Sequence, residues 1–425
     1  MALGADALSA VGTGLTLPFL MVYLHAVRGL GLDVAGVATA MVAFAGLVGN
    51  PLGGAWVDRS GPRRVLAAGW VVAACGACGL ALASQPWQAF AAAAVSGLGA
   101  AMALPAQDAL LARLVPEQGR SGVFAMRHAM LNLGLAVGGL SAAWLVDVAR
   151  PGSFVLLYLL DAASFVLAVA LLGLVGGSHI TAVVMASDGG MVDAGARVAG
   201  GGYRAVLRDW LFVRLWVLLA VLVAVGFAQF NASFPVLATG AGLSAGLVGV
   251  AFTANTVTVT LVQLVVLRLV RGRRRTAAIG VLCCLWALSW ALVLAGGHLK
   301  AGTAAVAFIL AAVVFGLGET LFAPTLPALV NGIAPEALRG RYNGAAAFAY
   351  TVGFAAGPAL AGLLLQHGLT TLLLAGLVFG CAAAGLLAAS VRRRLPLAAD
   401  LIDPPSAGPG PAGLGTAAAP KEVTT

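Results

Sequence analysis

Two long apolar runs flank the stretch Gly54-Ala-Trp-Val-Asp58-Arg59-Ser-Gly61-Pro-Arg63-Arg64. This short segment holds one acid, three arginines and two glycines. A glycine gives the backbone freedom that a tight turn needs, and an acid near helix ends can cap free N–H groups or pair with a guanidinium. Positively charged anchors alone would require neither residue at these spacings. The stretch therefore predicts a structured turn between two membrane-spanning helices.

The composition of the whole chain is that of a membrane protein. Of its 425 residues, 61% are hydrophobic and 9% are charged, whereas soluble domains carry about 25% charged residues. Apolar runs of about 18 residues or more match the length that crosses a hydrocarbon core. The formal net charge of +9 does not indicate nucleic acid, because the arginines lie in short loops and not on one basic face. We expect an all-α polytopic membrane protein that contacts the lipid bilayer.

Twelve apolar runs are bounded by charged residues, Pro or Gly. They cover residues 5–26, 34–56, 65–84, 88–111, 123–146, 153–175, 211–238, 244–269, 277–296, 302–330, 343–366 and 369–391. These runs predict twelve transmembrane helices.

The basic residues predict the orientation of these helices. If both termini are cytoplasmic, all of the 24 Lys and Arg residues except Arg28, Arg150 and Lys300 lie in or beside inner segments, as the positive-inside rule requires. The one long inner connection, 176–210, contains three glycine clusters and predicts a flexible linker. The predicted units are an N-terminal six-helix bundle (1–175), a cytoplasmic linker (176–210), a C-terminal six-helix bundle (211–391) and a disordered cytoplasmic tail (392–425).

The two halves of the chain repeat each other. At an offset of 219 residues, Gly97, Gly99, Pro105, Pro116-Glu117, Arg120, Gly134 and Gly138 meet identical residues in the second half. At an offset of 211 residues, Gly61, Arg63-Arg64 and Gly69 do the same, but Leu269 stands at the position of Asp58. A tandem six-helix repeat is one of the architectures of secondary transporters. We therefore expect two six-helix pseudo-repeats, with the acidic turn in the first half only.

The opening stretch, G-x-x-x-D-R-x-G-x-R-R, resembles the signature between helices 2 and 3 of the major facilitator superfamily of secondary transporters. This resemblance extends over almost the whole chain, from span 1 to span 12. It implies that Gly54, Asp58, Arg59, Gly61 and Arg64 lock the cytoplasmic gate while the transporter faces outward. The sequence departs from the proton-coupled exporters of the family at two places. Those exporters carry an arginine in span 4, where this chain has Ala93. Their glycine-rich antiporter signature lies in span 5, whereas this chain has a similar pattern in span 11.

Two repeated Pro-Glu-x-x-Arg turns follow spans 4 and 10. Glu117 and Arg120 in the first turn, and Glu336 and Arg339 in the second, have the i, i+3 spacing of helical ion pairs. A gating role and a plain surface ion pair fit this pattern equally well.

Acids inside membrane spans are costly and mark functional sites. Glu319 lies well inside span 10, which lines the cavity in this superfamily, and it is the main candidate for proton or cation coupling. Asp108 is a second candidate, although it lies near the inner end of span 4 and could instead pair with Arg113 or Arg127. Asp161 in span 6 fits helix packing as well as function.

Spans 1, 4, 7 and 10, with 2, 5, 8 and 11 beside them, would face the cavity of such a transporter. Their polar and aromatic residues predict an amphipathic lining with few fixed charges. The candidate substrate-binding residues are Thr16, Tyr23, Asn132, Gln229, Phe230, Asn231, Asn255, Phe315, Phe322 and Tyr350. Such a lining favours a small, lipophilic or weakly polar substrate.

The leading hypothesis is an efflux transporter of small lipophilic molecules, coupled to protons through Glu319. The alternatives are a uniporter or a sugar or metabolite exporter without proton coupling, and a non-transporting membrane sensor. The sequence holds no phosphate-binding loop, metal cluster or catalytic triad, so we expect no enzyme, metal or cofactor. We expect a monomer. A composition rich in Ala, Gly and Arg and poor in Lys favours a bacterial inner membrane.

Overall fold

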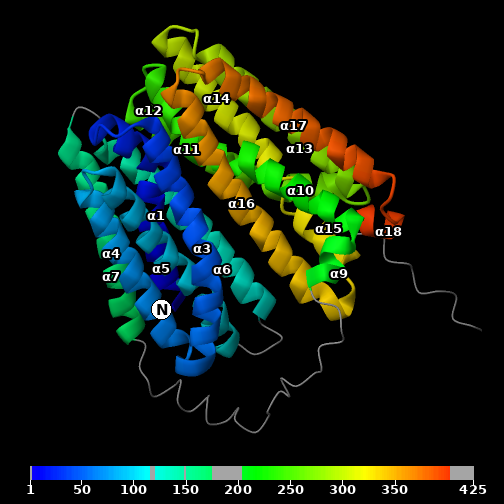
Figure 1. The fold of residues 1–425 in the computed structure, drawn as a ribbon. Coiled ribbons are helices and arrows are strands. Elements are labelled where there is room, and N and C mark those ends of the chain that lie inside the picture. Colours follow the sequence, from blue (N-terminus) through cyan, green and yellow to red (C-terminus); the bar gives the residue numbers. More distant parts are fainter. Residues whose placement is uncertain (1, 115–119, 148–149, 175–202, 403–425) are drawn as a thin grey trace, which may run out of the picture.

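The computed structural model describes all residues except 1, 115–119, 148–149, 175–202 and 403–425. Within the described part the chain is helical, and its only β-type pairing is an isolated bridge between Arg274 and Leu401. Figure 1 shows two helical bundles side by side, the first in blue to teal and the second in green to red.

The first bundle contains six membrane-spanning segments. The first of these is assembled from four short helices that follow one another without a break. Their bounds are α1 (Ala2–Thr16), η1 (Leu17–Phe19), α2 (Leu20–Val22) and η2 (Tyr23–Val27). The other five are continuous: α3 (Leu32–Ser60), α4 (Pro62–Leu82), α5 (Pro86–Leu114), α6 (Arg120–Leu145) and α7 (Pro151–Leu174).

The second bundle repeats this plan but interrupts two of its spans. Span 7 is divided at Gly226 into α10 (Trp210–Val225) and α11 (Phe227–Gly240), and span 10 into α14 (Ala301–Glu319) and α15 (Leu326–Ile333). The continuous spans are α12 (Ala245–Val270), α13 (Arg275–Gly296), α16 (Arg339–Gln366) and α17 (Thr370–Arg392). Short helices α9 (Tyr203–Arg208), η4 (Glu336–Leu338) and α18 (Leu397–Asp400) lie outside the spans.

The prediction of a twelve-helix membrane fold is confirmed. Eleven segments are long and apolar enough to cross a membrane, and a shorter apolar helix, Met130–Ala142, lies within α6. Together these segments correspond to the twelve apolar runs of the sequence.

Two predicted connecting regions contain ordered elements. The predicted linker, 176–210, includes α9, and its residues up to 202 lie outside the described part. Residues 393–402, at the start of the predicted disordered tail, are described and pack against the second bundle, where Ile402 and Asp400 are buried. We call the face that carries the α3–α4 turn, the end of α7 and α9 the linker face, and the other end of the bundles the opposite face.

The two bundles touch most closely at the opposite face. There α3 begins and α16 ends, and the backbone amide of Leu32 donates to Oε1 of Gln366 at 2.6 Å. Gly36 lies so close to α16 that a Cβ atom at this position would be 2.3 Å from the carbonyl oxygen of Pro358 and 3.0 Å from Cα of Gly362. Small residues allow such close approach of membrane helices. In Figure 1 the bundles diverge from this contact toward the linker face.

Replacing Gly36 with valine should force α3 and α16 apart at the opposite face. Overpacking of this kind costs about 1–3 kcal/mol, so the opposite face should open about tenfold more often. The measurement is the rate at which a cysteine introduced at Leu365 reacts with a membrane-impermeant maleimide, in a variant without the native cysteines. Gly152→Val is the matched control, because nothing lies within 4 Å of a Cβ at that position; equal rates in both variants would contradict the prediction.

Candidate functional site

A cavity of about 200 Å³ lies between the two bundles. Its walls come from the first span and α6 on one side, and from α11, α12 and the end of α14 on the other. The lining residues are Gly14, Leu17, Pro18, Asn132, Leu135, Ala136, Gly139, Phe227, Phe230, Asn231, Phe252, Thr253, Asn255, Thr256 and Glu319. One carboxyl group, several amides and hydroxyls and three phenylalanine rings therefore face a shared space at the interface of the repeats.

Glu319 is the only ionisable group among these lining residues. It is the last residue of α14, and Nδ2 of Asn255 donates to its Oε2 at 3.3 Å. No basic side chain in the described part of the chain forms an ion pair with it. An ionised carboxyl group at membrane depth is costly without a partner. The carboxyl group is therefore suited to take up a proton or to bind a cationic ligand.

The break in span 10 places Glu319 at the cavity. Helix α14 ends at Glu319, and residues 320–325 form a turn before α15 begins. Pro324 lies in this turn and has no N–H to donate to a helical hydrogen bond. Nε2 of Gln263 donates to the carbonyl oxygen of Thr320 at 3.2 Å, which compensates for one of the freed backbone groups. Non-helical backbone at membrane depth is tolerated where it is buried or lines a cavity, and here it does so.

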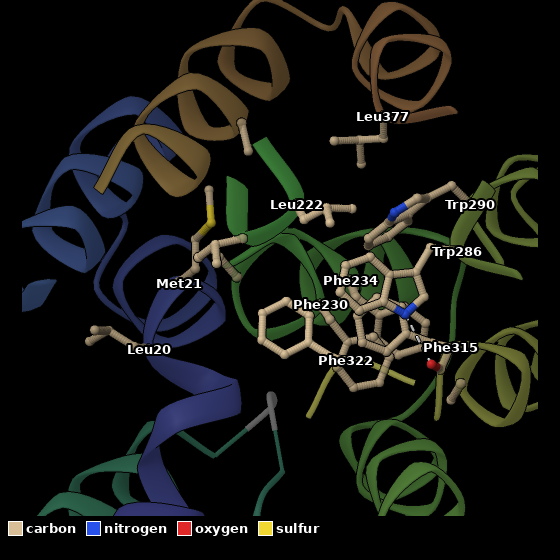
Figure 2. Packing of buried hydrophobic residues seen from close by; sticks show 14 of the residues in the cluster. Leu20, Met21, Leu222, Phe230, Phe234, Trp286, Trp290, Phe315, Phe322 and Leu377 are labelled. Carbon is tan, nitrogen blue, oxygen red and sulfur yellow. Dashed lines mark hydrogen bonds between the residues drawn. The ribbon is translucent and has the colours of Figure 1, made fainter. Parts of the chain in front are cut away.

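An aromatic cluster supports the cavity wall on the side of the second bundle. The rings of Phe230 and Phe315 stack with centroids 4.4 Å apart, and Phe315 and Trp286 stack at 4.7 Å. Nε1 of Trp286 donates to the carbonyl oxygen of Phe315 at 3.1 Å. Figure 2 shows these rings together with Phe234, Phe322 and Trp290. Because Phe230 faces the cavity and Phe315 lies behind it, the cluster holds the wall in a fixed shape.

The ten predicted substrate-binding residues lie in four different surroundings. Four of them, Asn132, Phe230, Asn231 and Asn255, line the central cavity. Phe315 and Phe322 lie in the aromatic cluster behind its wall. Tyr350 lines a second cavity of about 400 Å³, together with Asn50, Leu219, Pro327, Val330, Asn343, Ala346, Ala347 and Thr351. This second cavity lies toward the linker face.

The other three predicted substrate-binding residues link helices in this conformation. Oγ1 of Thr16 donates to Oδ2 of Asp161 at 2.9 Å, and the hydroxyl of Tyr23 donates to the carbonyl oxygens of Leu80 and Ala81 at the end of α4. The amide nitrogen of Gln229 donates to the carbonyl oxygen of Gly357 at 2.9 Å. All three are buried away from the central cavity, and their role as substrate ligands stays a prediction.

The turn at 54–64 is exposed at the linker face. The side chains of Asp58, Arg59 and Arg64 are exposed and form no hydrogen bond or ion pair with any residue that the structure describes. Gly61 has φ = 82°, a conformation in which glycine is favoured. Arg63 donates to the carbonyl oxygens of Leu172 and Gly173 at the end of α7, at 2.8 and 3.0 Å. The turn is therefore anchored to its own bundle, while its acid is not engaged.

The two Pro-Glu-x-x-Arg turns are only partly described. Glu117 and the side chain of Arg120 lie outside the described residues. Glu336, in η4, and Arg339, at the start of α16, are exposed, and no ion pair joins them. The gating roles of these four residues, like those in the 54–64 turn, stay predictions.

A charged network inside the first bundle is not apparent from the sequence. Arg127 donates from Nε to Asp6 at 2.7 Å, from one terminal nitrogen to Asp108 at 2.6 Å and from the other to the amide oxygen of Gln107 at 2.6 Å. Gln107 in turn donates to Asp6. Asp6 and Arg127 are buried, whereas the Asp108 side chain is 57% exposed. Asp6 does not stand out in the sequence because it lies so close to the first residue. For Asp108 the sequence left Arg113 and Arg127 as possible partners, and the structure pairs it with Arg127.

Asp161 is a second carboxyl group buried in the first bundle. Its Oδ2 accepts the hydrogen bond from Thr16, and its Oδ1 has no hydrogen-bond partner; the nearby Tyr158 hydroxyl has none either. A Cβ atom at Gly12 would be 2.6 Å from Oδ1, so glycine at this position lets α1 and α7 approach. Asp161 therefore joins α1 to α7, which agrees with the helix-packing role that the sequence left open for it.

Two six-helix bundles with a cavity between them, in contact with each other at one face, match the architecture of a secondary transporter. The sequence profile of the Major Facilitator Superfamily matches residues 3–295 and again residues 216–418. The chain therefore belongs to the Major Facilitator Superfamily, and it is a multi-pass membrane protein of the transporter class.

Similar proteins agree with this assignment. The chain is 25% identical over 362 residues to YqjV, an uncharacterized MFS-type transporter of Bacillus subtilis (strain 168), covering 84% of this chain and 83% of YqjV. It is 26% identical over 360 residues to a Na(+), Li(+), K(+)/H(+) antiporter of Planococcus maritimus, covering 79% and 82% of the two chains. The crystal structure of the nucleoside transporter NupG has the same fold, with a TM-score of 0.73, 14% identity and coverage of 92% of this chain and 97% of that chain.

Proposed function

We propose that this transporter exports a small amphipathic molecule across the bacterial inner membrane in exchange for protons. The observation that carries the proposal is Glu319, a carboxyl group without a basic partner at the helix break beside the cavity. Phe227, Phe230 and Phe252 offer apolar and aromatic contacts in the same space. A proton and a cationic or hydrogen-bonding substrate would compete for the one carboxyl group.

Alternation between the two faces completes the cycle. The linker face is taken as cytoplasmic, since the basic residues gather there. In the described conformation the bundles touch at the opposite face, so the cavity is placed to receive substrate from the cytoplasm. Release of the Gly36–Gly362 contact and closure of the linker face would expose the cavity to the outside. A proton taken up by Glu319 from the outside would displace the substrate.

The test is transport by the purified protein in proteoliposomes. Candidate lipophilic compounds are added at equal concentrations, and acidification or alkalinisation of the lumen is followed with a trapped pH-sensitive dye. Proton movement that depends on a compound, and compound accumulation that depends on the pH gradient, would support the proposal. A transport rate that is independent of the pH gradient would instead indicate the uniport or metabolite-export alternative. Compound binding with no flux would indicate a sensor.

Antiport of monovalent cations is a second candidate function. The 26% identical antiporter of Planococcus maritimus suggests it, and the cavity combines the Glu319 carboxyl group with oxygen atoms of Asn231, Thr253 and Thr256. Hard cations bind such oxygen ligands. Adding Na⁺, Li⁺ or K⁺ to the same proteoliposomes, without any organic compound, separates this function from compound export.

Asp58 should act as the lock of the linker face. When the bundles close there, its carboxylate is expected to accept hydrogen bonds that it lacks in the described conformation. Hydrogen bonds to charged groups contribute about 1.5–3 kcal/mol, so Asp58→Asn should lower the transport rate about tenfold or more. The measurement is the initial rate at equal protein density in proteoliposomes. Asp147→Asn, an exposed acid at the opposite face, is the control, and an unchanged rate in Asp58→Asn would contradict the gate.

A further inference from the structure

The segment after the last transmembrane helix folds back onto the α12–α13 turn. The backbone N–H of Ile402 donates to the carbonyl oxygen of Arg273 at 3.0 Å, and that of Gly272 donates to the carbonyl oxygen of Ile402 at 2.8 Å. Asp400 is 1% exposed and accepts hydrogen bonds from the backbone N–H and the hydroxyl of Thr276, at 2.9 and 3.0 Å. We call residues 397–402 the C-terminal clamp.

The clamp docks at the α12–α13 turn, which has no acid at the position that corresponds to Asp58. The α12–α13 turn is the counterpart of the 54–64 turn, and Leu269 occupies the position that corresponds to Asp58. Asp400 brings a carboxylate to the first residues of α13, where free N–H groups favour a negative charge. It also lies 3.9 Å from Arg274, which corresponds to Arg63. The tail therefore supplies to the second half an acid that the first half carries within its own turn.

The clamp is also connected to the break in span 10. Arg275 donates from its terminal nitrogen to the carbonyl oxygen of Ala399 in the clamp, at 2.7 Å, and from Nε to the carbonyl oxygen of Pro324, at 3.4 Å. Pro324 lies in the turn that separates Glu319 from α15. On the far side of that turn, Ala399 also lies against Gly332 near the end of α15. One arginine thus links the clamp to the chain segment that follows Glu319.

We propose that the C-terminal clamp, held by Asp400 and Arg275, positions the broken span 10 and thereby sets the placement of Glu319 at the cavity. Asp400 and Arg275 act as positioning residues, since neither lines the cavity. The hydrogen bonds of the clamp described above all join it to the second bundle, so the α12–α13 turn would stay fixed while the 54–64 turn engages and releases. The inference rests on the proposed function only for its effect on transport; the docking itself is independent of it.

The experiment compares four forms of the protein in lipid nanodiscs and proteoliposomes. They are the unaltered chain, Asp400→Ala, a chain ending at residue 402 and a chain ending at residue 395. Hydrogen exchange is measured at the amides of Gly272 and Thr276, and the pH dependence of transport is measured for the same forms. The chain ending at 402 is the matched control because it keeps the whole clamp.

Asp400→Ala should speed exchange at Thr276 about fivefold, the change that loss of a helix cap of about 1 kcal/mol produces. The chain ending at 395 should lose protection at Gly272 as well, and the chain ending at 402 should behave like the unaltered protein. Both disrupted forms should also shift the pH at which transport is half-maximal, because Glu319 would be placed differently.

Equal exchange at Gly272 and Thr276 in all four forms would overturn the docking. Faster exchange with an unchanged pH profile would overturn the positioning role, because a purely structural clamp alters the amount of folded protein and leaves the pH profile in place. If the unaltered protein moves no protons with any compound or cation, the proposed function fails, but the exchange measurement still decides whether the clamp forms.

Discussion

Glu319→Gln is expected to abolish proton movement in proteoliposomes while the protein stays folded. Glutamine has nearly the shape of glutamate, and its side-chain oxygen can still accept the hydrogen bond from Asn255. What it cannot do is release and take up a proton, because a side-chain amide does not ionise as a carboxyl group does. Substrate-driven acidification should therefore fall to the level of empty liposomes, and any remaining transport should no longer depend on pH.

The effect on substrate binding separates two classes of cargo. A cationic substrate loses a charge-assisted interaction of about 1.5–3 kcal/mol, so its affinity for Glu319→Gln should fall about tenfold to a hundredfold. A neutral substrate should bind about as well as before and exchange across the membrane without protons. Binding is measured by isothermal calorimetry or by quenching of tryptophan fluorescence in detergent.

Asp147→Asn is the matched control for Glu319→Gln. Asp147→Asn removes an acid that pairs with Arg150 on the exposed opposite face, and it should leave both proton movement and binding unchanged. If Glu319→Gln moves protons at the rate of the unaltered protein, the coupling role of Glu319 is wrong. Asp6 and Asp161, the other buried carboxyl groups of the membrane spans in the described part, would then be the next groups to test.

The sequence was sufficient to predict the twelve spans because the bilayer limits what a spanning segment can be. Each span needs enough apolar residues to cross the hydrocarbon core, so length and composition alone identify it. Glu319 could be singled out for the same reason: an acid inside such a run is rare and conspicuous. Its place at a helix break could not be predicted, because Pro105, the counterpart of Pro324 in the first half, lies inside the continuous helix α5.

The direction of each side chain could not be predicted in the same way. A span in lipid is apolar on all sides, so its sequence does not show which face meets a neighbouring helix. Thr16 and Tyr23 share the first span with cavity-lining Leu17, yet both donate to groups inside their own bundle. Gln229 and Phe230 are neighbours, and only Phe230 reaches the cavity. These differences depend on helix rotation, which tertiary packing sets.

Contacts between residues far apart in the sequence could not be predicted either. Asp6 and Arg127 are 121 positions apart, and a single sequence contains no signal that joins them. The clamp could not be predicted because Pro, Ala and Gly dominate the tail and predict disorder, although Asp400 and Ile402 provide a buried acid and an apolar anchor within it.

Arg127→Met should greatly lower the stability of the first bundle. Arg127 neutralises Asp6, which is 4% exposed, and its guanidinium is held by Asp6, Gln107 and Asp108 from three directions. Methionine fills a similar volume but leaves the Asp6 carboxylate buried without a counter-ion. Breaking a buried ion pair by removing one partner costs about 3–5 kcal/mol, so the detergent-solubilised protein should unfold at a clearly lower temperature.

The exposed ion pair at the opposite face provides the comparison. Arg150 and Asp147 form a contact of 3.4 Å in which the Arg150 side chain is 82% exposed, and surface pairs contribute about 0–1 kcal/mol. Arg150→Met should therefore leave the melting temperature nearly unchanged. Adding Asp6→Asn to Arg127→Met removes the stranded charge and should restore part of the lost stability, whereas a simple volume defect would not respond to it. If Arg127→Met and Arg150→Met melt at the same temperature, the network does not stabilise the first bundle and Asp6 is not buried as a charged group.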